Sequence, residues 1–274
     1  MQNPGHLPTP AILMAAAVAM LPATAHASDR VFSYTYQTAV LNPGDTELEP
    51  WTTLRAGRER HYLGFDNRLE LEAGVVRNLQ TALYINTRAV NQDVTDELGE
   101  VQRAESYTFQ GVSSEWKYKL SDPVANAVGS AVYVEGGIAP HEAELELKLL
   151  LDKHFGDLIV AANLVGEYER EWETPGDIEN EIVVEVDLGI GYRVTEAFAA
   201  GFELHQVNEL EDGSELESAT LFGGPSLALS GGEWWSVLTF MPQLAAFAGA
   251  SDGDFRDLEH REKVEVRLLM GFHL

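Results

Sequence analysis

The last twelve residues of the chain, KVEVRLLMGFHL at 263–274, alternate between polar and apolar side chains. Successive side chains of an extended strand point to opposite faces, so this segment predicts a β-strand with one apolar and one polar face. Leu269 is the single exception to the alternation. The segment reaches the final residue without a polar tail, which is rare in a soluble protein. Two architectures are open at this point: the last strand of a soluble β-sandwich, or the closing strand of a membrane β-barrel.

The beginning of the chain has the composition of a targeting segment. Residues 11–27 (AILMAAAVAMLPATAHA) are uncharged and apolar, and Ala25-His26-Ala27 has the small-x-small pattern of a cleavage site. This predicts a secretory signal peptide over residues 1–27, cut before Ser28, with a retained membrane anchor as the alternative. No later segment approaches about eighteen consecutive apolar residues, so no transmembrane helix is expected after it.

Charge and cysteine content narrow the class of protein. The chain has 18 basic and 44 acidic side chains, a net charge of −26, and no cysteine. Such an acidic surface is unsuited to nucleic acid, which needs basic groups. An exported chain without disulfides depends on its own packing or on a membrane for stability. No linker rich in proline and serine divides the chain, so one domain is expected over residues 46–274, preceded by an extended lead-in at 28–45.

The two-faced pattern of the C-terminal segment recurs from Thr46 onward. In Glu142–Asp152, leucines at every second position oppose glutamates and a lysine. Glu and Leu are good helix formers, but leucines at this spacing would wrap around a helix and leave it no apolar face. Short turns alternate with polar stretches such as 91–104, 171–180 and 208–217, which are expected to be loops. Counted in this way, the chain contains about twelve strands.

The charged positions decide between sandwich and barrel. Charges occur deep inside most of the predicted strands, where a sandwich core would bury them unpaired. A closed barrel turns them toward its lumen and leaves no open sheet edge. The sequence therefore predicts an all-β, antiparallel, up-and-down transmembrane barrel in the bacterial outer membrane. Arg30–Leu41 does not fit the even strand count and is expected to lie extended against or inside the barrel; if it spans, the count rises to about fourteen.

Four segments resemble an established family. They are Phe32–Leu41, the turn Asn42-Pro43-Gly44-Asp45, the strand that carries Glu47, Glu49, Trp51 and Arg55, and Arg68–Ile85 (RLELEAGVVRNLQTALYI). In layout the chain is similar to the outer-membrane proteins of the phenol meta-pathway group and to other little-characterised outer-membrane barrels. The resemblance implies location, fold and a role in transport, and it brings no catalytic residues. Such barrels usually end in Phe, whereas this chain ends in Leu274 with Phe272 two residues earlier; these two residues are the expected assembly signal.

Inward-facing charges are the candidate functional residues of such a barrel, because rings of charge set ion preference in pores. An open lumen with net negative charge predicts a channel or transporter for small solutes that favours cations. The alternative is a structural or adhesive barrel whose lumen is filled by a neutralising network. The predicted lumen residues are Arg55, Arg68, Glu70, Glu72, Arg88, Glu115, Lys117, Lys119, Glu144, Glu146, Lys148, Glu185, Asp187, Arg193, Glu203, His205 and Arg267.

Catalytic and metal sites are weakly indicated. The chain has no Gly-x-Ser-x-Gly motif, and His205 beside Glu203 is the best candidate base for the less favoured reading, an outer-membrane lipase or deacylase. Two acidic stretches could offer oxygen ligands to calcium, but their spacing does not match an EF-hand, so neither a metal site nor a cofactor is expected. The expected partners are outer-membrane lipids and lipopolysaccharide, the barrel-assembly machinery and a small solute. The two acidic stretches that could offer ligands to calcium consist of Asp252, Asp254, Asp257 and Glu259, and of Glu209, Glu211, Asp212 and Glu215.

Overall fold

The computed structural model describes residues 30–96, 98–174, 177–251 and 253–274. The predicted signal peptide, residues 1–27, lies outside the described residues. Nowhere in the described part of the chain does a helix have the length and apolar character needed to cross a membrane.

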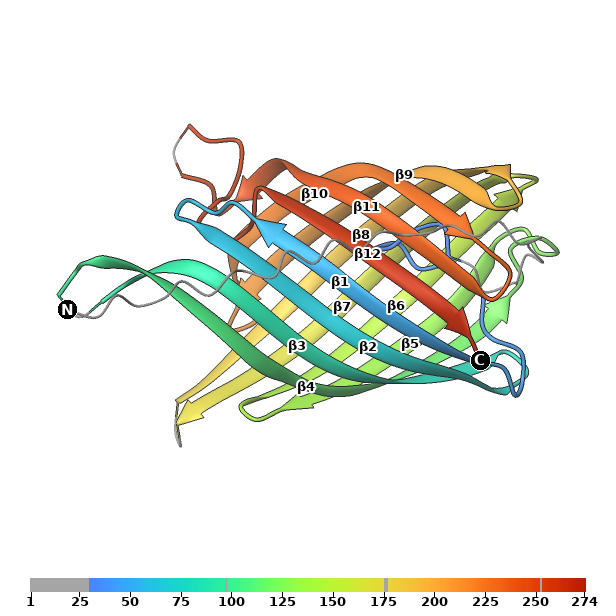
Figure 1. The fold of residues 1–274 in the computed structure, drawn as a ribbon, viewed down its shortest axis with the longest axis horizontal. Helices are drawn as coiled ribbons and strands as arrows, with labels where there is room; N and C mark the ends of the chain where they lie inside the picture. The colour runs from blue at the N-terminus through green and yellow to red at the C-terminus, as the bar shows by residue number, and fades with distance from the viewer. Residues whose placement is uncertain (1–29, 97, 175–176, 252) are drawn as a thin grey trace, which may run out of the picture.

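The described residues form one closed antiparallel barrel (Figure 1). Each strand pairs with its neighbours in sequence, and the first strand pairs with the last, Glu47 opposite His273 and Ala56 opposite Val264. The prediction of an all-β barrel with twelve strands is confirmed, and the alternative of fourteen is wrong. The strands are β1 Thr46–Ala56, β2 Tyr62–Val76, β3 Leu79–Thr95, β4 Val101–Ser121, β5 Gly129–Ala139, β6 Glu142–Phe155, β7 Leu158–Thr174, β8 Asp177–Thr195, β9 Phe198–Glu211, β10 Glu215–Ser230, β11 Trp234–Ala248 and β12 Val264–His273.

The period-two pattern determines which side chains face outward. In β6, Leu145, Leu147 and Leu149 are 47%, 52% and 42% exposed on the outer surface, while Glu146 and Lys148 face the lumen. The same division holds along the other strands, so a broad band of exposed apolar side chains encircles the barrel. A soluble monomer rarely exposes so large an apolar surface, whereas a bilayer covers it.

The polar stretches expected as loops are mostly strand. β3 and β4 continue through 91–104 as a hairpin that projects beyond the barrel wall (Figure 1), and an ion pair joins Arg103 to Asp93 across it at 2.8 Å. β7 and β8 likewise extend into 171–180, and β9 and β10 into 208–217. These expectations were wrong because both faces of a projecting hairpin meet water. The backbone pairing continues there while the apolar alternation, the signal for a strand, disappears.

Residues 30–45 enter the barrel and make no strand of it (Figure 1). Val31 and Phe32 pack inside the lumen in an apolar cluster with Trp235 and Leu269. Leu269 breaks the alternation of the last strand because its side chain, fully buried, faces this segment instead of water. We call residues 30–41 the plug, because they fill the half of the lumen nearer the short turns.

Two glycines of β8 make room for the plug. A Cβ atom built on Gly191 would lie 2.7 Å from Cγ1 of Val31, and one on Gly189 would lie 3.0 Å from the ring of Phe32. The first of these contacts is shorter than real Cβ atoms show, and the second is tighter than most of them, so the plug would have to give way at either position. The wall is therefore thinned where the plug presses against it.

Candidate functional site: a charged vestibule above a plugged lumen

One buried carboxylate holds the middle of the plug. Glu203 in β9 is fully buried, and its Oε2 accepts hydrogen bonds from the backbone N–H groups of Tyr34 and Thr35, both at 2.8 Å. Its Oε1 accepts from the N–H of Ser33 at 3.0 Å and from the hydroxyl of Thr239 at 2.9 Å. The carboxylate and the plug backbone satisfy each other, so removal of either leaves the other with unmet polar groups.

The rest of the plug is held in the same manner. Asn163 in β7 accepts from the N–H of Tyr36 at 2.6 Å and donates to its carbonyl at 2.9 Å. Asp152 in β6 accepts from the hydroxyl of Thr38 at 2.6 Å. Gln80 in β3 accepts from the backbone N–H of Leu41, the last residue of the plug, at 3.0 Å. These anchors are side chains from strands around the barrel, and strand pairing contributes none of them. The plug is thus a separate segment docked in the lumen.

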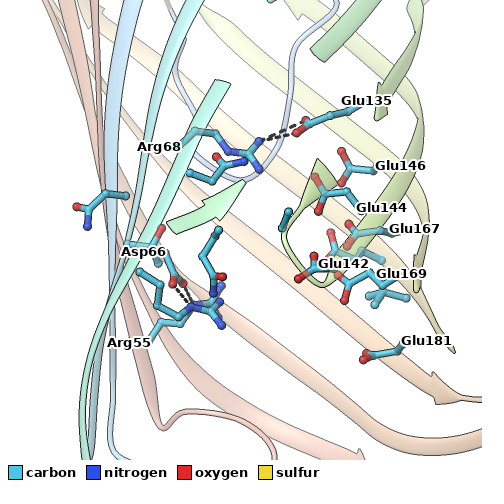
Figure 2. A pocket seen from close by; sticks show the side chains of 18 of the residues that line it. Arg55, Asp66, Arg68, Glu135, Glu142, Glu144, Glu146, Glu167, Glu169 and Glu181 are labelled. Atoms are coloured by element: carbon cyan, nitrogen blue, oxygen red, sulfur yellow. Dashed lines mark hydrogen bonds and ion pairs between the residues drawn. The ribbon is translucent and has the colours of Figure 1, made fainter. Parts of the chain in front are cut away.

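Above the plug lies a cavity of about 990 Å³. Tyr34 and Tyr36 of the plug contribute to its lining, and at the other end it reaches Pro140 and His141 in the β5–β6 connection. Its two walls carry opposite charge (Figure 2). We call this cavity the vestibule. Arginines line one wall, Arg55, Arg68, Arg88 and Arg267, and acidic residues line the other, Glu142, Glu144, Glu146, Glu167, Glu169 and Glu181.

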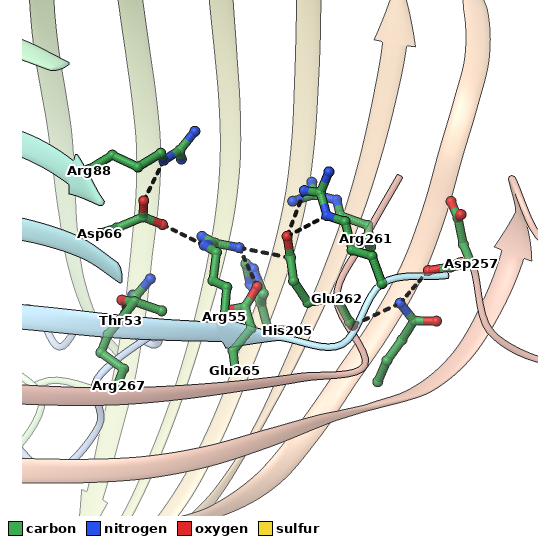
Figure 3. A network of polar contacts seen from close by, with 12 residues as sticks. Thr53, Arg55, Asp66, Arg88, His205, Asp257, Arg261, Glu262, Glu265 and Arg267 are labelled. Carbon is green, nitrogen blue, oxygen red and sulfur yellow. Dashed lines mark hydrogen bonds and ion pairs between the residues drawn. The ribbon is translucent and has the colours of Figure 1, made fainter. Parts of the chain in front are cut away.

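Most arginines of the first wall are already paired. Arg55 contacts Asp66 at 2.6 Å and also forms an ion pair with Glu265, and Arg88 binds the other oxygen of Asp66 at 2.5 Å (Figure 3). Arg68 reaches across to Glu135 at 3.1 Å (Figure 2). The positive charge of this wall is therefore largely neutralised within it or by the wall opposite.

Arg267 differs from the other arginines of its wall. Its guanidinium lies 3.8 Å from the centre of the Tyr34 ring, and its Nε donates to the hydroxyl of Thr53 at 2.8 Å. It also donates to the carbonyl of Ser33 at 3.3 Å. Arg267 therefore joins the barrel wall to the plug by stacking and hydrogen bonding, and no ion pair described in the structure involves it.

Most of the acidic wall is not neutralised in this way, although Glu146 pairs with Lys148 at 3.0 Å. Glu144 and Glu169 lie directly opposite each other on β6 and β7, and Glu169 lies directly opposite Glu181 on β8. Like charges in such positions repel and lower stability. Carboxylate oxygens of Glu142, Glu144 and Glu169 approach within 4.8 Å of one another, and among the described ion pairs none joins these three to a basic side chain. The vestibule therefore has an excess of negative charge on one side.

The predicted lumen residues fall into three places. Ten line the vestibule, and five are buried deeper in the lumen, beside the plug. Lys119 and Arg193 lie near the short turns, where Lys119 binds Asp122 at 2.8 Å. Those of the vestibule are Arg55, Arg68, Arg88, Glu144, Glu146, Lys148, Glu185, Asp187, His205 and Arg267; those beside the plug are Glu70, Glu72, Glu115, Lys117 and Glu203.

Sequence reasoning missed several residues of the vestibule. Glu142 and Glu169 share the parity of Glu144 and Glu167 along their strands, so the alternation could have found them. Glu262 pairs with Arg58 at 2.6 Å from the connection between β11 and β12, where no strand pattern exists to place it. Its role depends on the path of the loop.

His205, the candidate base, lies beside two other acidic residues. Its Nδ1 lies 2.6 Å from Oδ1 of Asp187, and its Nε2 lies 3.9 Å from Glu185. Glu203 binds the plug backbone instead, because residues two apart on a strand face the same side but lie at different depths. His205 and Glu203 therefore make separate contacts.

Among the described residues, the two acidic stretches do not bring their carboxylates together as a set of metal ligands. Asp257 is buried and accepts from the hydroxyl of Ser218 at 2.8 Å, and Glu209 forms an ion pair with Arg261 at 2.5 Å. Three groups of acidic residues and histidine come close enough to share an ion in the described part of the chain, and none includes a residue of these two loops. Asp252 lies outside the described residues.

Solved structures of outer-membrane proteins share this fold. The COG4313 outer membrane channel from Pseudomonas putida F1 is 13% identical, with a TM-score of 0.57 over 89% of this chain and all of that one. The NanC porin is 11% identical, with a TM-score of 0.54 over 83% of this chain and all of that one. At these identities the similarity establishes the fold. No curated protein matches the chain in sequence. Residues 24–274 match the model of a family of unknown function, DUF6662, and the chain belongs to that family.

Proposed function

We propose that the protein is a channel of the bacterial outer membrane that conducts small solutes, favours cations, and is closed by its plug. The observation that carries the proposal is the vestibule, a polar cavity of about 990 Å³ inside a closed barrel with an apolar outer belt. A barrel needs a cavity of this kind to conduct, and a structural barrel does not. Its excess of negative charge would concentrate cations in the entrance.

The outer membrane suits the surface of the barrel. The belt of exposed leucines, valines and aromatic residues fits a bilayer, and the proposal includes export by the signal peptide over 1–27. Phe272 and Leu274 would serve as the assembly signal for the barrel-assembly machinery, and lipopolysaccharide would surround the outer end. The resemblance to the phenol meta-pathway group suggests a solute of small size. No enzymatic role is proposed, since the described contacts of His205 are with Asp187, Glu185 and aromatic rings and include no serine hydroxyl that could act as a nucleophile.

The second candidate is a structural or adhesive barrel that does not conduct. The plug favours it, because residues 30–41 fill the lumen below the vestibule with buried aromatic and aliphatic side chains. The two candidates differ in one property. In a gated channel the plug leaves the lumen; in a structural barrel it is a permanent part of the core.

Planar-bilayer recording separates the two candidates. We expect the refolded full chain to show rare openings, and a variant lacking residues 30–41 to conduct steadily. In a salt gradient the reversal potential of that variant should indicate cation preference, and Glu144→Gln with Glu169→Gln should reduce it. Heat-modifiable gel mobility shows whether each variant is folded. Folded variants that never conduct would support the structural barrel instead.

A further inference from the structure

A second acidic cluster lies deep in the barrel, outside the vestibule. Glu49 of β1 and Glu70 and Glu72 of β2 face the lumen at the level of the plug, and they are 2%, 2% and 8% exposed. One carboxylate oxygen from each lies within 4.8 Å of the other two. Glu49 and Glu70 are directly opposite each other across the two strands, a position in which like charges repel.

Several oxygens of this region have no hydrogen-bond partner. They include Oε2 of Glu49 and Oε1 of Glu70, both buried. Glu115, on β4, is 1% exposed; its Oε2 accepts from the hydroxyl of Tyr84, while its Oε1 is buried without a partner. Glu115 is within electrostatic reach of both Glu70 and Glu72. Buried carboxylate oxygens are costly unless hydrogen bonds or a cation compensate them.

The nearby basic side chains are too few to compensate the cluster. Arg30 of the plug approaches Oε2 of Glu49 only to 3.9 Å. Lys117 is within electrostatic reach of Glu115. Four carboxylates against two basic groups leave an excess of two negative charges. Glu47, the next inward residue of β1, is within electrostatic reach of Glu49 but has partners of its own, Trp235 at 2.6 Å and His273 at 2.5 Å. A divalent cation would supply the missing charge.

The geometry favours calcium among divalent cations. Calcium binds carboxylate oxygens at about 2.3–2.6 Å, so two oxygens on one ion can be at most about 5 Å apart. Magnesium demands strict octahedral geometry, usually keeps several waters and is bound through one or two carboxylates. Three carboxylates with oxygens within 4.8 Å of one another, and a fourth nearby, fit the larger ion, which accepts many protein oxygens in irregular geometry.

We propose that Glu49, Glu70 and Glu72 bind a calcium ion inside the barrel, beside the plug, with Glu115 as a neighbouring oxygen donor. The ion joins β1 to β2 and neutralises the cluster. Since Arg30 reaches toward Glu49 from the plug, the ion also lies where the plug meets the wall. The site does not depend on whether the barrel conducts.

Calcium binding to the refolded full chain in detergent tests the site. Equilibrium dialysis with radioactive calcium should show a bound ion that Glu70→Gln or Glu49→Gln weakens by about tenfold or more, because each removes a charged ligand. Calcium should raise the melting temperature of the wild type and leave that of Glu70→Gln unchanged. Two variants are used because either alone could disturb folding, which gel mobility monitors.

The vestibule provides the matched control. Glu144→Gln removes one carboxylate from the other glutamate cluster and should leave this calcium binding and the calcium-dependent melting shift intact. Absence of calcium binding by the wild type would overturn the proposal. So would binding that Glu144→Gln abolishes and Glu70→Gln leaves unchanged, since the ion would then be in the vestibule. Neither result bears on conductance, so the proposed channel function would stand or fall separately.

Discussion

Replacement of Glu203 by glutamine should release the plug. Each oxygen of Glu203 accepts two hydrogen bonds, three of the four from plug backbone. An amide keeps one accepting oxygen and turns an NH₂ group toward the other pair of partners. Two bonds are lost if that group faces the N–H groups of Tyr34 and Thr35, and at least one if it faces Ser33 and Thr239, whose hydroxyl can rotate and accept. Hydrogen bonds to a charged group are each worth about 1.5–3 kcal/mol, so the loss is about 1.5–6 kcal/mol.

This loss acts on the equilibrium between docked and released plug. At about 1.4 kcal/mol per factor of ten, the released population should rise by roughly one to four orders of magnitude. The figure is an upper bound, since water partly satisfies Glu203 once the plug has left. The change should lower barrel stability much less, because strand pairing does not involve the plug.

Thiol labelling measures the released population directly. The chain contains no cysteine, so Ser33→Cys places a single thiol on the plug in an otherwise unreactive background. Its rate of reaction with a water-soluble maleimide should rise when Glu203→Gln is added. Glu181→Gln, in the vestibule wall, is the control and should not change the rate. Equal labelling with and without Glu203→Gln, in folded barrels, would refute the view that this carboxylate holds the plug.

Three further predictions concern the wall, a turn and the outer belt. Gly191→Leu should also raise labelling of the plug thiol, because its Cβ alone would lie 2.7 Å from Val31. At a short turn, hydrogen bonds from Lys119 and from the turn backbone hold the pKa of Asp122 well below its usual range. The ionised carboxylate of Asp122 therefore stabilises the folded barrel above the ordinary carboxyl pKa, and this stabilisation is lost as pH falls through the lowered pKa. Asp122→Asn should accordingly lower the melting temperature at pH 7 and lower it by less in strong acid. Leu147→Arg should destabilise the barrel in lipid by about 2–4 kcal/mol in urea titrations if this position lies near the bilayer midplane, and far less in detergent.

The strands and their faces could be predicted because the alternation is local. Each strand carries its own pattern, so β6 could be recognised from its leucines and glutamates without knowledge of its neighbours. The projecting hairpins could not, since water on both faces removes the pattern while backbone pairing persists. The alternation alone places Glu142 and Glu169 on the inward face of their strands. How closely they approach each other across β6 and β7 depends on the strand register, which the alternation does not give.

The partners of the inward side chains are the part that sequence could not give. Glu203 binds a segment about 170 residues earlier in the chain, which no spacing rule connects to it. Asn163 and Asp152 meet the same segment from two other strands. These contacts are set by how far the plug enters the lumen, and that depth follows from the closed barrel as a whole.

The exceptions to the alternation carry information of their own. Leu269 is an apolar residue on a polar face, and Gly189 and Gly191 are positions where that face has no side chain. Each departs from the pattern of a lumen filled with water, and each contacts or makes room for Val31 and Phe32. A lumen that only conducted ions would require neither a fully buried leucine nor glycines at two successive inward-facing positions of a strand. The barrel sequence is therefore matched to its own N-terminal segment, and any account of conduction must begin with how that segment leaves.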